Sequence, residues 1–248
     1  MFKTRIHCAL CALVLVVLCP AWNAQVASSG TSKPPRVAYY VDTAVLNVQA
    51  LVADPPAVGS AANKAELATL HGIEAARTSQ LAASAKADED EEDMFAFKSV
   101  LGSQFTPELL PLTAELGTHV KNEQSVVGGL LKRNFQRPRP YQTDSTLHPI
   151  CALKSAHDSY PSGHALTGYL EALTLAELFP DKRNAILERA DEYARNRLVC
   201  GVHYPSDIEA SRRVAYAVFG FMLSSPKFQH DLEASRAEIH AKSLPTGK

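Results

Sequence analysis

The sequence predicts an all-α protein built as a single compact helical domain. The chain has 248 residues, of which 46% are hydrophobic and 21% are charged, a composition typical of a globular protein. Apolar residues recur at helical spacing behind capping residues and prolines, and no credible pair of strands and no internal repeat is present. The formal net charge of −1 argues against a nucleic-acid partner, because such domains are normally basic.

The first 24 residues have the pattern of a secretory signal peptide. Lys3 and Arg5 precede an apolar core at 8–18, which is too short to span a bilayer comfortably. Small residues behind this core place the expected cleavage between about 24 and 29. We therefore expect a periplasmic or secreted protein with no stable membrane insertion after cleavage. The alternative is an N-terminal membrane anchor.

Removal of this leader leaves two cysteines, Cys151 and Cys200. In an exported protein such a pair favours one disulfide. The disulfide would close a loop of about 50 residues and add about 3–4 kcal/mol of stability in the chain-entropy description. Two free buried thiols are the alternative.

The segments ahead of the main helices are less regular. Residues 25–60 are rich in Ser, Pro, Val and Ala and predict an extended Pro-rich lead-in packed over the body. Residues 63–85 are rich in Ala, Leu and Glu and lack proline, which predicts one helix. The acidic run at 88–93 predicts a solvated, mobile surface turn, with a metal or partner site as the less favoured alternative.

A long helix is expected next, with Thr106 as its N-cap and Pro107 at its first position. It runs to about Phe135 and is loosened at the glycines 128–129. Prolines and polar residues then predict a loop over 138–160.

The C-terminal third predicts further helices that complete the domain of residues 61–241. Residues 163–179 are apolar on most helical faces, so this helix is expected to be buried. Asp181 is expected to cap a helix that runs to about 199. Helices over 207–223 and 226–241 follow.

Residues 161–164 read Pro-Ser-Gly-His at the start of the apolar helix. The first backbone N–H groups of a helix have no intrahelical partners and, with the helix dipole, favour a bound anion. Gly163 allows an oxyanion to approach the backbone, Ser162 adds a hydroxyl donor, and His164 stands on the first turn. The alternative is an ordinary helix start with a surface histidine.

A second cluster pairs His203 with Asp207, four residues later. A carboxylate bonded to one imidazole nitrogen fixes the tautomer and leaves the lone pair of the other nitrogen free to attack. Arg197 lies six residues before His203, near the end of the preceding helix. A purely structural His–Asp pair is the alternative.

Lys132 and Arg139 supply two further cations around the end of the long helix. Together with Arg197 they form a set of positive charges able to converge on one oxyanion, the arginines by forked bonding and the lysine as a point charge. The alternative is a basic surface patch, because Arg133 and Arg137 lie nearby.

Taken together, the clusters form an ordered pattern: Lys-x6-Arg-Pro at 132–140, Pro-Ser-Gly-His at 161–164 and Arg-x5-His-x3-Asp at 197–207. This pattern resembles the signature shared by type 2 phosphatidic acid phosphatases, bacterial non-specific acid phosphatases and vanadium haloperoxidases. One departure is Asn196, where the superfamily usually has serine; it affects the fine geometry rather than the chemistry.

Within that superfamily the chain most resembles the secreted class A bacterial acid phosphatases. The proline-rich stretch 55–60, the Ser-Tyr at 159–160 and the Cys-Gly-Val-His-Tyr at 200–204 are similar to segments of that class. The resemblance covers most of residues 37–240, more loosely over 61–105, and implies a compact all-helical fold.

The resemblance also implies a role for each residue. His203 would attack phosphorus and form a phosphohistidine, Asp207 would orient it, and His164 would act as general acid and then general base. No metal and no cofactor are expected, because side-chain cations supply the positive charge. The groups expected to hold the phosphate oxygens are Lys132, Arg139, the Ser162 hydroxyl, the Gly163 N–H and Arg197.

The substrates implied are a broad range of phosphate monoesters, namely nucleotides, sugar phosphates and aryl phosphates. Transfer of phosphate to alcohols is an expected side activity, and an acid pH optimum is expected. Vanadate, molybdate and phosphate are expected inhibitors, and a homo-oligomer is suggested by analogy.

Three alternative functions remain at this point. A vanadate-dependent haloperoxidase belongs to the same superfamily, although the chain is short for one. A lipid phosphatase is another, although the missing membrane spans count against an integral one. A non-catalytic exported oxyanion binder would need the cations but not His164, His203 and Asp207 together.

Overall fold

The described part of the chain comprises residues 36–242 and Leu244 of the computed structural model. Every regular element within it is a helix, which confirms the all-α prediction. Over the same residues, no helix combines the length and the apolarity that a membrane span requires. The predicted signal peptide at 1–24 and its cleavage region lie outside the described residues.

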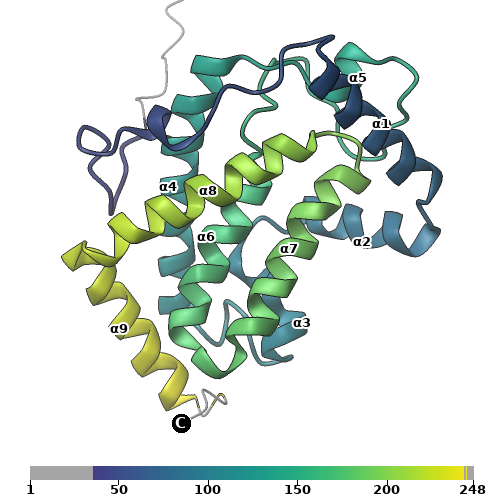
Figure 1. Ribbon diagram of the computed structural model, residues 1–248. Coiled ribbons are helices and arrows are strands. Elements are labelled where there is room, and N and C mark those ends of the chain that lie inside the picture. The colour runs from purple at the N-terminus through teal and green to yellow at the C-terminus, as the bar shows by residue number, and fades with distance from the viewer. Residues whose placement is uncertain (1–35, 243, 245–248) are drawn as a thin grey trace, which may run out of the picture. The chain divides into compact units, whose positions relative to one another are not determined.

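The apolar helix α6 (Gly163–Leu178) lies at the centre of the fold (Figure 1). It packs against α4 (Pro111–Phe135), α7 (Arg183–Val199) and α8 (Pro205–Leu223). Most of its residues are buried, as its apolar faces predict. The close approach of α7 requires a glycine, because a Cβ added at Gly168 would lie 2.6 Å from the Tyr193 ring. The main hydrophobic core surrounds α6.

The C-terminal helices agree with the prediction except at their starts. A short 3-10 turn, η3 (Pro180–Lys182), precedes α7, so Asp181 lies in this turn and Lys182 is the N-cap residue. The helix α8 begins at Pro205 instead of 207, because proline is well suited to the first helical position. The last helix, α9 (Pro226–Ala241), packs on α4.

The single helix predicted over 63–85 is wrong. The structure has two helices, α1 (Ala61–Ala75) and α2 (Ser79–Asp90). The break occurs because Thr78 adopts an extended conformation and its hydroxyl accepts a hydrogen bond from the Leu81 N–H at 3.2 Å, which starts a new helix. The composition favours helix both before and after Thr78, so it does not reveal the helix cap between the two.

The predicted start of the long helix is also wrong. The Thr106 hydroxyl accepts from the Leu109 N–H, but this closes a separate turn, and α4 begins at Pro111 with Leu110 as its N-cap residue. Two short elements, η2 (Met94–Phe97) and α3 (Lys98–Leu101), fill the segment before it. The end at Phe135 agrees with the prediction, and the helix continues without a break through 128–129.

The described part of the lead-in is held to the body by buried contacts. Tyr40 is 7% exposed, its N–H donates to a Glu123 carboxylate oxygen at 2.9 Å, and its hydroxyl donates to Asp231 at 2.8 Å. The 3-10 turn η1 (Val48–Leu51) follows and packs against α4 and α8. The start of the chain's described part is therefore tied to both α4 and α9.

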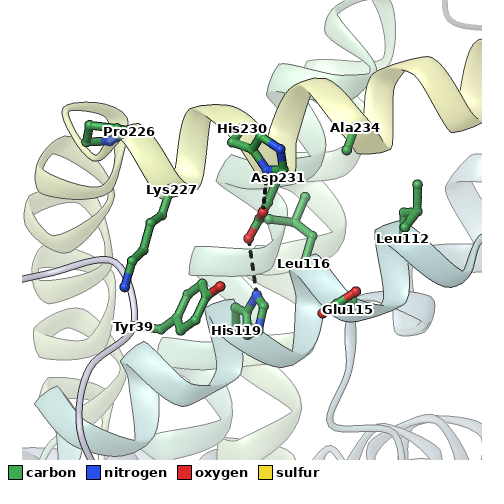
Figure 2. Close-up of a pocket in the computed structure, with 10 residues that line it drawn as sticks. All are labelled: Tyr39, Leu112, Glu115, Leu116, His119, Pro226, Lys227, His230, Asp231 and Ala234. Atoms are coloured by element: carbon green, nitrogen blue, oxygen red, sulfur yellow. Dashed lines mark hydrogen bonds and ion pairs between the residues drawn. The ribbon is translucent and has the colours of Figure 1, made fainter.

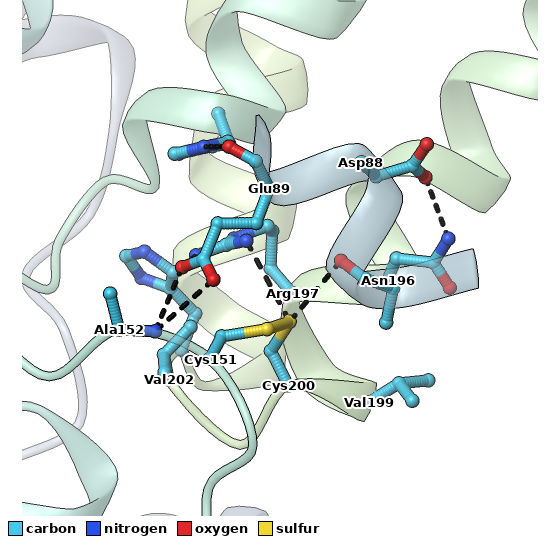
Figure 3. Close-up of a disulfide and its surroundings, with 12 residues drawn as sticks. Asp88, Glu89, Cys151, Ala152, Asn196, Arg197, Val199, Cys200 and Val202 are labelled. Carbon is cyan, nitrogen blue, oxygen red and sulfur yellow. Dashed lines mark hydrogen bonds and ion pairs between the residues drawn. A yellow bond between two sulfur atoms is a disulfide. The ribbon is translucent and has the colours of Figure 1, made fainter. Parts of the chain in front are cut away.

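The stretch 138–160 is a loop interrupted only by α5 (Pro140–Thr143). Its middle part lies against the end of α7, where Cys151 and Cys200 form a disulfide with a Cα–Cα distance of 5.2 Å (Figure 3). The structure therefore contains the disulfide that the sequence favoured, not two free thiols. It joins two segments that are 49 residues apart in the sequence.

We expect reduction of this disulfide to lower the free energy of unfolding by about 3 kcal/mol, because it releases a long loop in the unfolded chain. The measurement is urea unfolding of the Cys151→Ser/Cys200→Ser double variant beside the unaltered protein, with peptide mapping to verify the bond. Identical unfolding curves for the two proteins, with the bond verified, would contradict this expectation.

Candidate functional site

A cavity of about 170 Å³ opens at the N-terminus of α6. Its other walls come from the end of α2 and the residues after it, from α4, from the loop at 138–160, from the end of α7 and from the loop before α8. Segments far apart in the sequence therefore meet there. Its lining contains cations, carboxylates and two histidines: Glu89, Glu92, Gln124, Lys132, Arg139, Ala152, Lys154, Asp158, Gly163, His164, Arg197 and His203.

His203 stands just before α8 and Asp207 lies in its first turn. The His203 Nδ1 atom is 3.2 Å from Asp207 Oδ2, and both side chains are almost fully buried. The same carboxylate oxygen accepts the Tyr204 N–H at 2.8 Å. The first turn of α8 therefore fixes the carboxylate and, through it, the imidazole.

Two more donors hold the Asp207 carboxylate. Arg137 Nη1 donates to Oδ1 at 2.6 Å, and the Ser159 hydroxyl donates to Oδ2 at 2.6 Å. Burial raises the pKa of Asp207, while these bonds and the Arg137 charge act against that rise. All of the partners donate, so they stabilise the ionised carboxylate.

The tautomer of His203 follows from its second contact. Arg139 Nη1 lies 3.2 Å from His203 Nε2, and a guanidinium can only donate, so Nε2 carries a lone pair and Nδ1 carries the proton facing Asp207. Burial lowers the pKa of His203 well below its usual range, and the charges of Arg139 and Lys132 lower it further. A neutral imidazole with an available Nε2 lone pair results.

Lys132 and Arg139 share Asp158. Arg139 Nε donates to an Asp158 carboxylate oxygen at 2.8 Å, and Lys132 Nζ donates to the Asp158 backbone carbonyl and lies 3.8 Å from its carboxylate. Burial lowers the pKa of Lys132 to about 8, although Asp158 acts in the opposite direction. The two cations are thus held in place on one wall of the cavity.

Arg197 reaches the cavity from the last turn of α7. Its Nη2 lies 3.5 Å from Glu89 Oε1, and the two Glu89 oxygens also accept the Ala152 N–H at 3.0 and 3.1 Å (Figure 3). Arg197 is 3% exposed and its buried Nε has no hydrogen-bond partner among the described residues. Burial lowers the pKa of Arg197, against the effect of Glu89.

His164 lies on the first turn of α6 with an acceptor at each ring nitrogen. Its Nδ1 is 2.9 Å from Glu92 Oε1, and its Nε2 is 3.3 Å from the backbone carbonyl oxygen of Glu89. The hydrogen bond with His164 lowers the pKa of Glu92 to about 2. Each ring nitrogen of His164 therefore faces an acceptor, the Glu92 carboxylate on one side and the Glu89 carbonyl on the other.

Of the neighbours Ser162 and Gly163, only Gly163 lines the cavity. Ser162 is fully buried and does not line the cavity; its hydroxyl oxygen caps α6 by accepting the Ala165 N–H at 3.4 Å. Gly163 lines the cavity, and a Cβ there would lie 3.3 Å from the Gln124 amide nitrogen. The lack of a side chain at 163 keeps the helix N-terminus open to the cavity.

The structure therefore brings six of the residues singled out from the sequence to one cavity. Asp207 lies behind His203, and Ser162 lies under the helix start. The six that line the cavity are Lys132, Arg139, Gly163, His164, Arg197 and His203.

Sequence reasoning missed the role of Arg137, which it grouped with a surface patch. Its side chain is only 3% exposed and bridges Asp207 and Glu66, each at 2.6 Å, while its guanidinium lies 3.8 Å above the Tyr204 ring. The signal available was its position two residues before Arg139 in a proline-bounded loop, which does not distinguish a buried from an exposed arginine.

The prediction of a mobile surface turn at 88–93 is wrong. Asp88 is 4% exposed and pairs with Arg189, while Glu89 and Glu92 line the cavity. A run of like charges normally indicates a solvated face. Here the cations that neutralise it come from distant helices, so the run itself gives no indication of its burial.

Asn196, the departure from the superfamily pattern, links α7 to α2. Its amide nitrogen donates to Asp88 Oδ2 at 2.6 Å, beside the disulfide (Figure 3). Arg189 binds the same carboxylate. The residue next to Arg197 therefore helps to hold α2, and with it Glu89, against the cavity.

A larger cavity of about 520 Å³ lies between α4 and α9, away from these residues (Figure 2). His119 Nδ1 lies 3.2 Å from Asp231 Oδ2, Tyr39 stacks on His119 with ring centroids 3.8 Å apart, and His230 bonds Asp231 at 3.1 Å. Its walls include apolar residues and lack the group of arginines found in the smaller cavity. The candidate site residues predicted from the sequence therefore line the smaller cavity and not this one.

The described residues also bear on metal binding. Among residues 36–242, no group of three or more His, Cys, Asp and Glu is arranged to hold a metal ion.

Comparison with known proteins identifies the family of the chain. The PAP2 superfamily model matches residues 121–231, a range that includes the predicted catalytic and phosphate-binding residues from Lys132 to Asp207. A non-specific acid phosphatase from Providencia stuartii is 30% identical over 221 residues, covering 83% of this chain and 86% of that protein.

Two further relatives match shorter stretches. An acid phosphatase from Zymomonas mobilis is 37% identical over 116 residues, covering 45% of this chain and 43% of that protein. A non-specific acid phosphatase from Salmonella typhimurium is 30% identical over 156 residues, covering 59% of this chain and 60% of that protein. These matches confirm the resemblance drawn from the sequence motifs: the chain belongs to the non-specific acid phosphatases of the PAP2 superfamily.

Proposed function

We propose that this enzyme is a secreted or periplasmic acid phosphatase that hydrolyses phosphate monoesters through a phosphohistidine at His203. The observation that carries the proposal is the state of His203. Its Nδ1 proton faces Asp207, and its Nε2 lone pair faces Arg139 in the cavity that His164 also lines. Such an imidazole is a positioned nucleophile with fixed positive charge beside it.

In the first step the His203 Nε2 lone pair attacks phosphorus and the bond from phosphorus to the ester oxygen breaks. Arg139 exchanges its contact with Nε2 for a phosphate oxygen, which frees the lone pair. His164 donates a proton to the departing oxygen, so that the product leaves as a neutral alcohol. Asp207 balances the charge that develops on the His203 ring.

In the second step water attacks the phosphorus of the phosphohistidine. His164, now neutral, takes a proton from that water, the P–N bond breaks, and the electron pair returns to His203 Nε2. An alcohol in place of water would give phosphate transfer, the side activity that we propose. Lys132, Arg139, Arg197 and the Gly163 N–H hold the non-bridging oxygens in both steps.

We propose a broad range of monoesters, including nucleotides, sugar phosphates and aryl phosphates. A second hollow of about 480 Å³ adjoins the cavity and shares Lys132 and Asp158 with it. This space supports the acceptance of leaving groups that differ in size. Vanadate, molybdate and phosphate would occupy the oxyanion position as inhibitors. By analogy with class A acid phosphatases, we also propose that the protein forms a homo-oligomer.

The proposal is tested by the hydrolysis of p-nitrophenyl phosphate over a range of pH. We expect activity without added metal and a maximum below pH 8, because His164 must begin protonated and Lys132, with its pKa lowered to about 8, loses its charge above that pH. The phosphoryl group, whose second pKa is about 6, also carries less negative charge at lower pH. A profile that peaks above about pH 8 would contradict the mechanism.

The same assay separates the alternatives. Bromide or chloride oxidation with peroxide and vanadate, in the absence of phosphate release, would indicate a haloperoxidase. Hydrolysis restricted to lipid phosphates would indicate a lipid phosphatase. Binding of phosphate without hydrolysis would indicate an oxyanion binder.

A further inference from the structure

We infer that Glu92 is a positioning residue for His164, and that Lys121 supports Glu92 in this role. The inference deepens the proposed function and rests on it, because it concerns the proposed general acid. Glu92 belongs to the acidic run at 88–93 and lies just after the end of α2, outside the three motifs that identified the site.

The contacts form a chain of three groups from three different elements. Glu92 Oε1 lies 2.9 Å from His164 Nδ1, and the second oxygen, Oε2, lies 3.2 Å from Lys121 Nζ on α4. One carboxylate oxygen therefore faces the imidazole and the other faces an ammonium group. The Lys121 contact orients the carboxylate, and the carboxylate orients the ring.

The second ring nitrogen shows what this orientation achieves. His164 Nε2 is 3.3 Å from the Glu89 backbone carbonyl, an acceptor that is weaker than a carboxylate. Glu92 thus holds a proton on Nδ1 firmly. The Nε2–H group can leave its contact with the Glu89 carbonyl and donate its proton to the ester oxygen of a substrate. Glu92 in this way selects the nitrogen that remains protonated and the nitrogen that donates.

The charges around His164 make such a counter-ion necessary. Cations from several elements share its cavity, so the ring stands among positive charges. Glu92 supplies opposing negative charge in direct contact with the ring, and Glu171, deeper in α6, has its pKa raised well above the usual range by burial and so adds none. The groups that line the cavity with His164 and carry or can carry charge are Lys132, Lys154, Arg139, Arg197, His203, Asp158, Glu89 and Glu92.

Glu92 is suited to an enzyme that works in acid. The bond with His164 lowers the pKa of its carboxyl to about 2. A carboxyl with a lowered pKa keeps its charge as the pH falls until that value is approached, so the Glu92–His164 pair persists across the acidic range in which the proposed mechanism operates.

The test is the Glu92→Gln variant, which keeps the shape of the side chain and removes its charge. With an alkyl phosphate, a poor leaving group that needs the proton, we expect kcat to fall by about tenfold or more. With p-nitrophenyl phosphate we expect a loss of less than about threefold. The alkaline limb of the kcat profile should move down by about one pH unit, which corresponds to a tenfold weaker hold on the proton. Lys121→Met should give a smaller shift in the same direction.

The matched control is Glu91→Gln, the same substitution at an exposed neighbour in the same run. It should leave kcat on both substrates and the pH profile unchanged. Thermal unfolding of each variant separates a folding defect from a catalytic one. Glu92→Asp keeps the charge, and it should regain part of the kcat on the alkyl phosphate that Glu92→Gln loses.

His164→Ala, assayed in parallel, separates the proposed role of His164 as general acid from the proposed role of Glu92 as its positioning residue. If His164→Ala loses activity equally on both substrates, the proposed general acid is wrong and the inference falls with it. If His164→Ala depends on the leaving group while Glu92→Gln does not, or if the pH profile of Glu92→Gln is unchanged, the inference alone is overturned.

Discussion

Replacement of His203 by alanine is expected to lower kcat by roughly 10⁴-fold or more on every phosphate monoester, the scale on which loss of a nucleophile acts. The loss should not depend on the leaving group, because both steps pass through the His203 nitrogen. Steady-state kinetics with p-nitrophenyl phosphate and with an alkyl phosphate measure it. The variant should still bind phosphate, since Arg139 and Arg197 do not depend on His203 for their carboxylate partners.

The control for this substitution is His240→Ala. His240 is exposed near the end of α9, a helix that contributes no residue to the cavity. It should retain the full rate. If His203→Ala keeps more than about a hundredth of the unaltered rate while remaining folded and pure, another group carries the nucleophilic step.

The second large effect is expected on stability, at Arg137. Arg137→Met removes the cation that bridges Asp207 and Glu66 and leaves two carboxylates without it, one of them fully buried. Loss of one partner of a buried ion pair costs about 3–5 kcal/mol. Urea unfolding should register a loss of this size, and kcat should fall as well because Asp207 is no longer held.

Two milder variants keep this prediction measurable if Arg137→Met does not fold. Arg137→Lys retains the charge but not the forked geometry, and Glu66→Gln removes only the outer carboxylate, so both should show smaller losses. The matched control is Arg133→Met, at an exposed arginine four residues earlier in the sequence. Its free energy of unfolding should lie within about 0.5 kcal/mol of that of the unaltered protein. An equally small effect at Arg137 would show that the buried bridge does not contribute to stability.

Much of the fold was accessible from the sequence because the signals were local. The apolar faces of 163–178 predict a buried central helix, and prolines at 205 and 226 lie at the starts of α8 and α9. The errors were local as well. Thr78 divides a helix-favouring stretch, and Pro111 starts a helix that Pro107 was equally suited to start.

For the site, the sequence identified the residues within the motifs but not the residues that support them. Six residues of the three motifs line one cavity, and the fixed spacing of the motifs made these residues recognisable. Glu89, Glu92 and Arg137 could not be recognised, because each has an unremarkable local sequence and acquires its role from a partner on a distant segment: Arg197, His164 and Asp207 respectively. Ser162 illustrates the opposite case, a motif residue whose hydroxyl caps the helix.

The covalent intermediate on His203 is the most direct test of the mechanism. The enzyme is mixed with a ³²P-labelled monoester, quenched in alkali within milliseconds and digested, and the labelled peptide is identified by mass spectrometry. We expect label on His203 that is stable in alkali and released by acid, as for a P–N bond, and no label in the His203→Ala variant. Full turnover with no labelled protein, or label on any other residue, would contradict it.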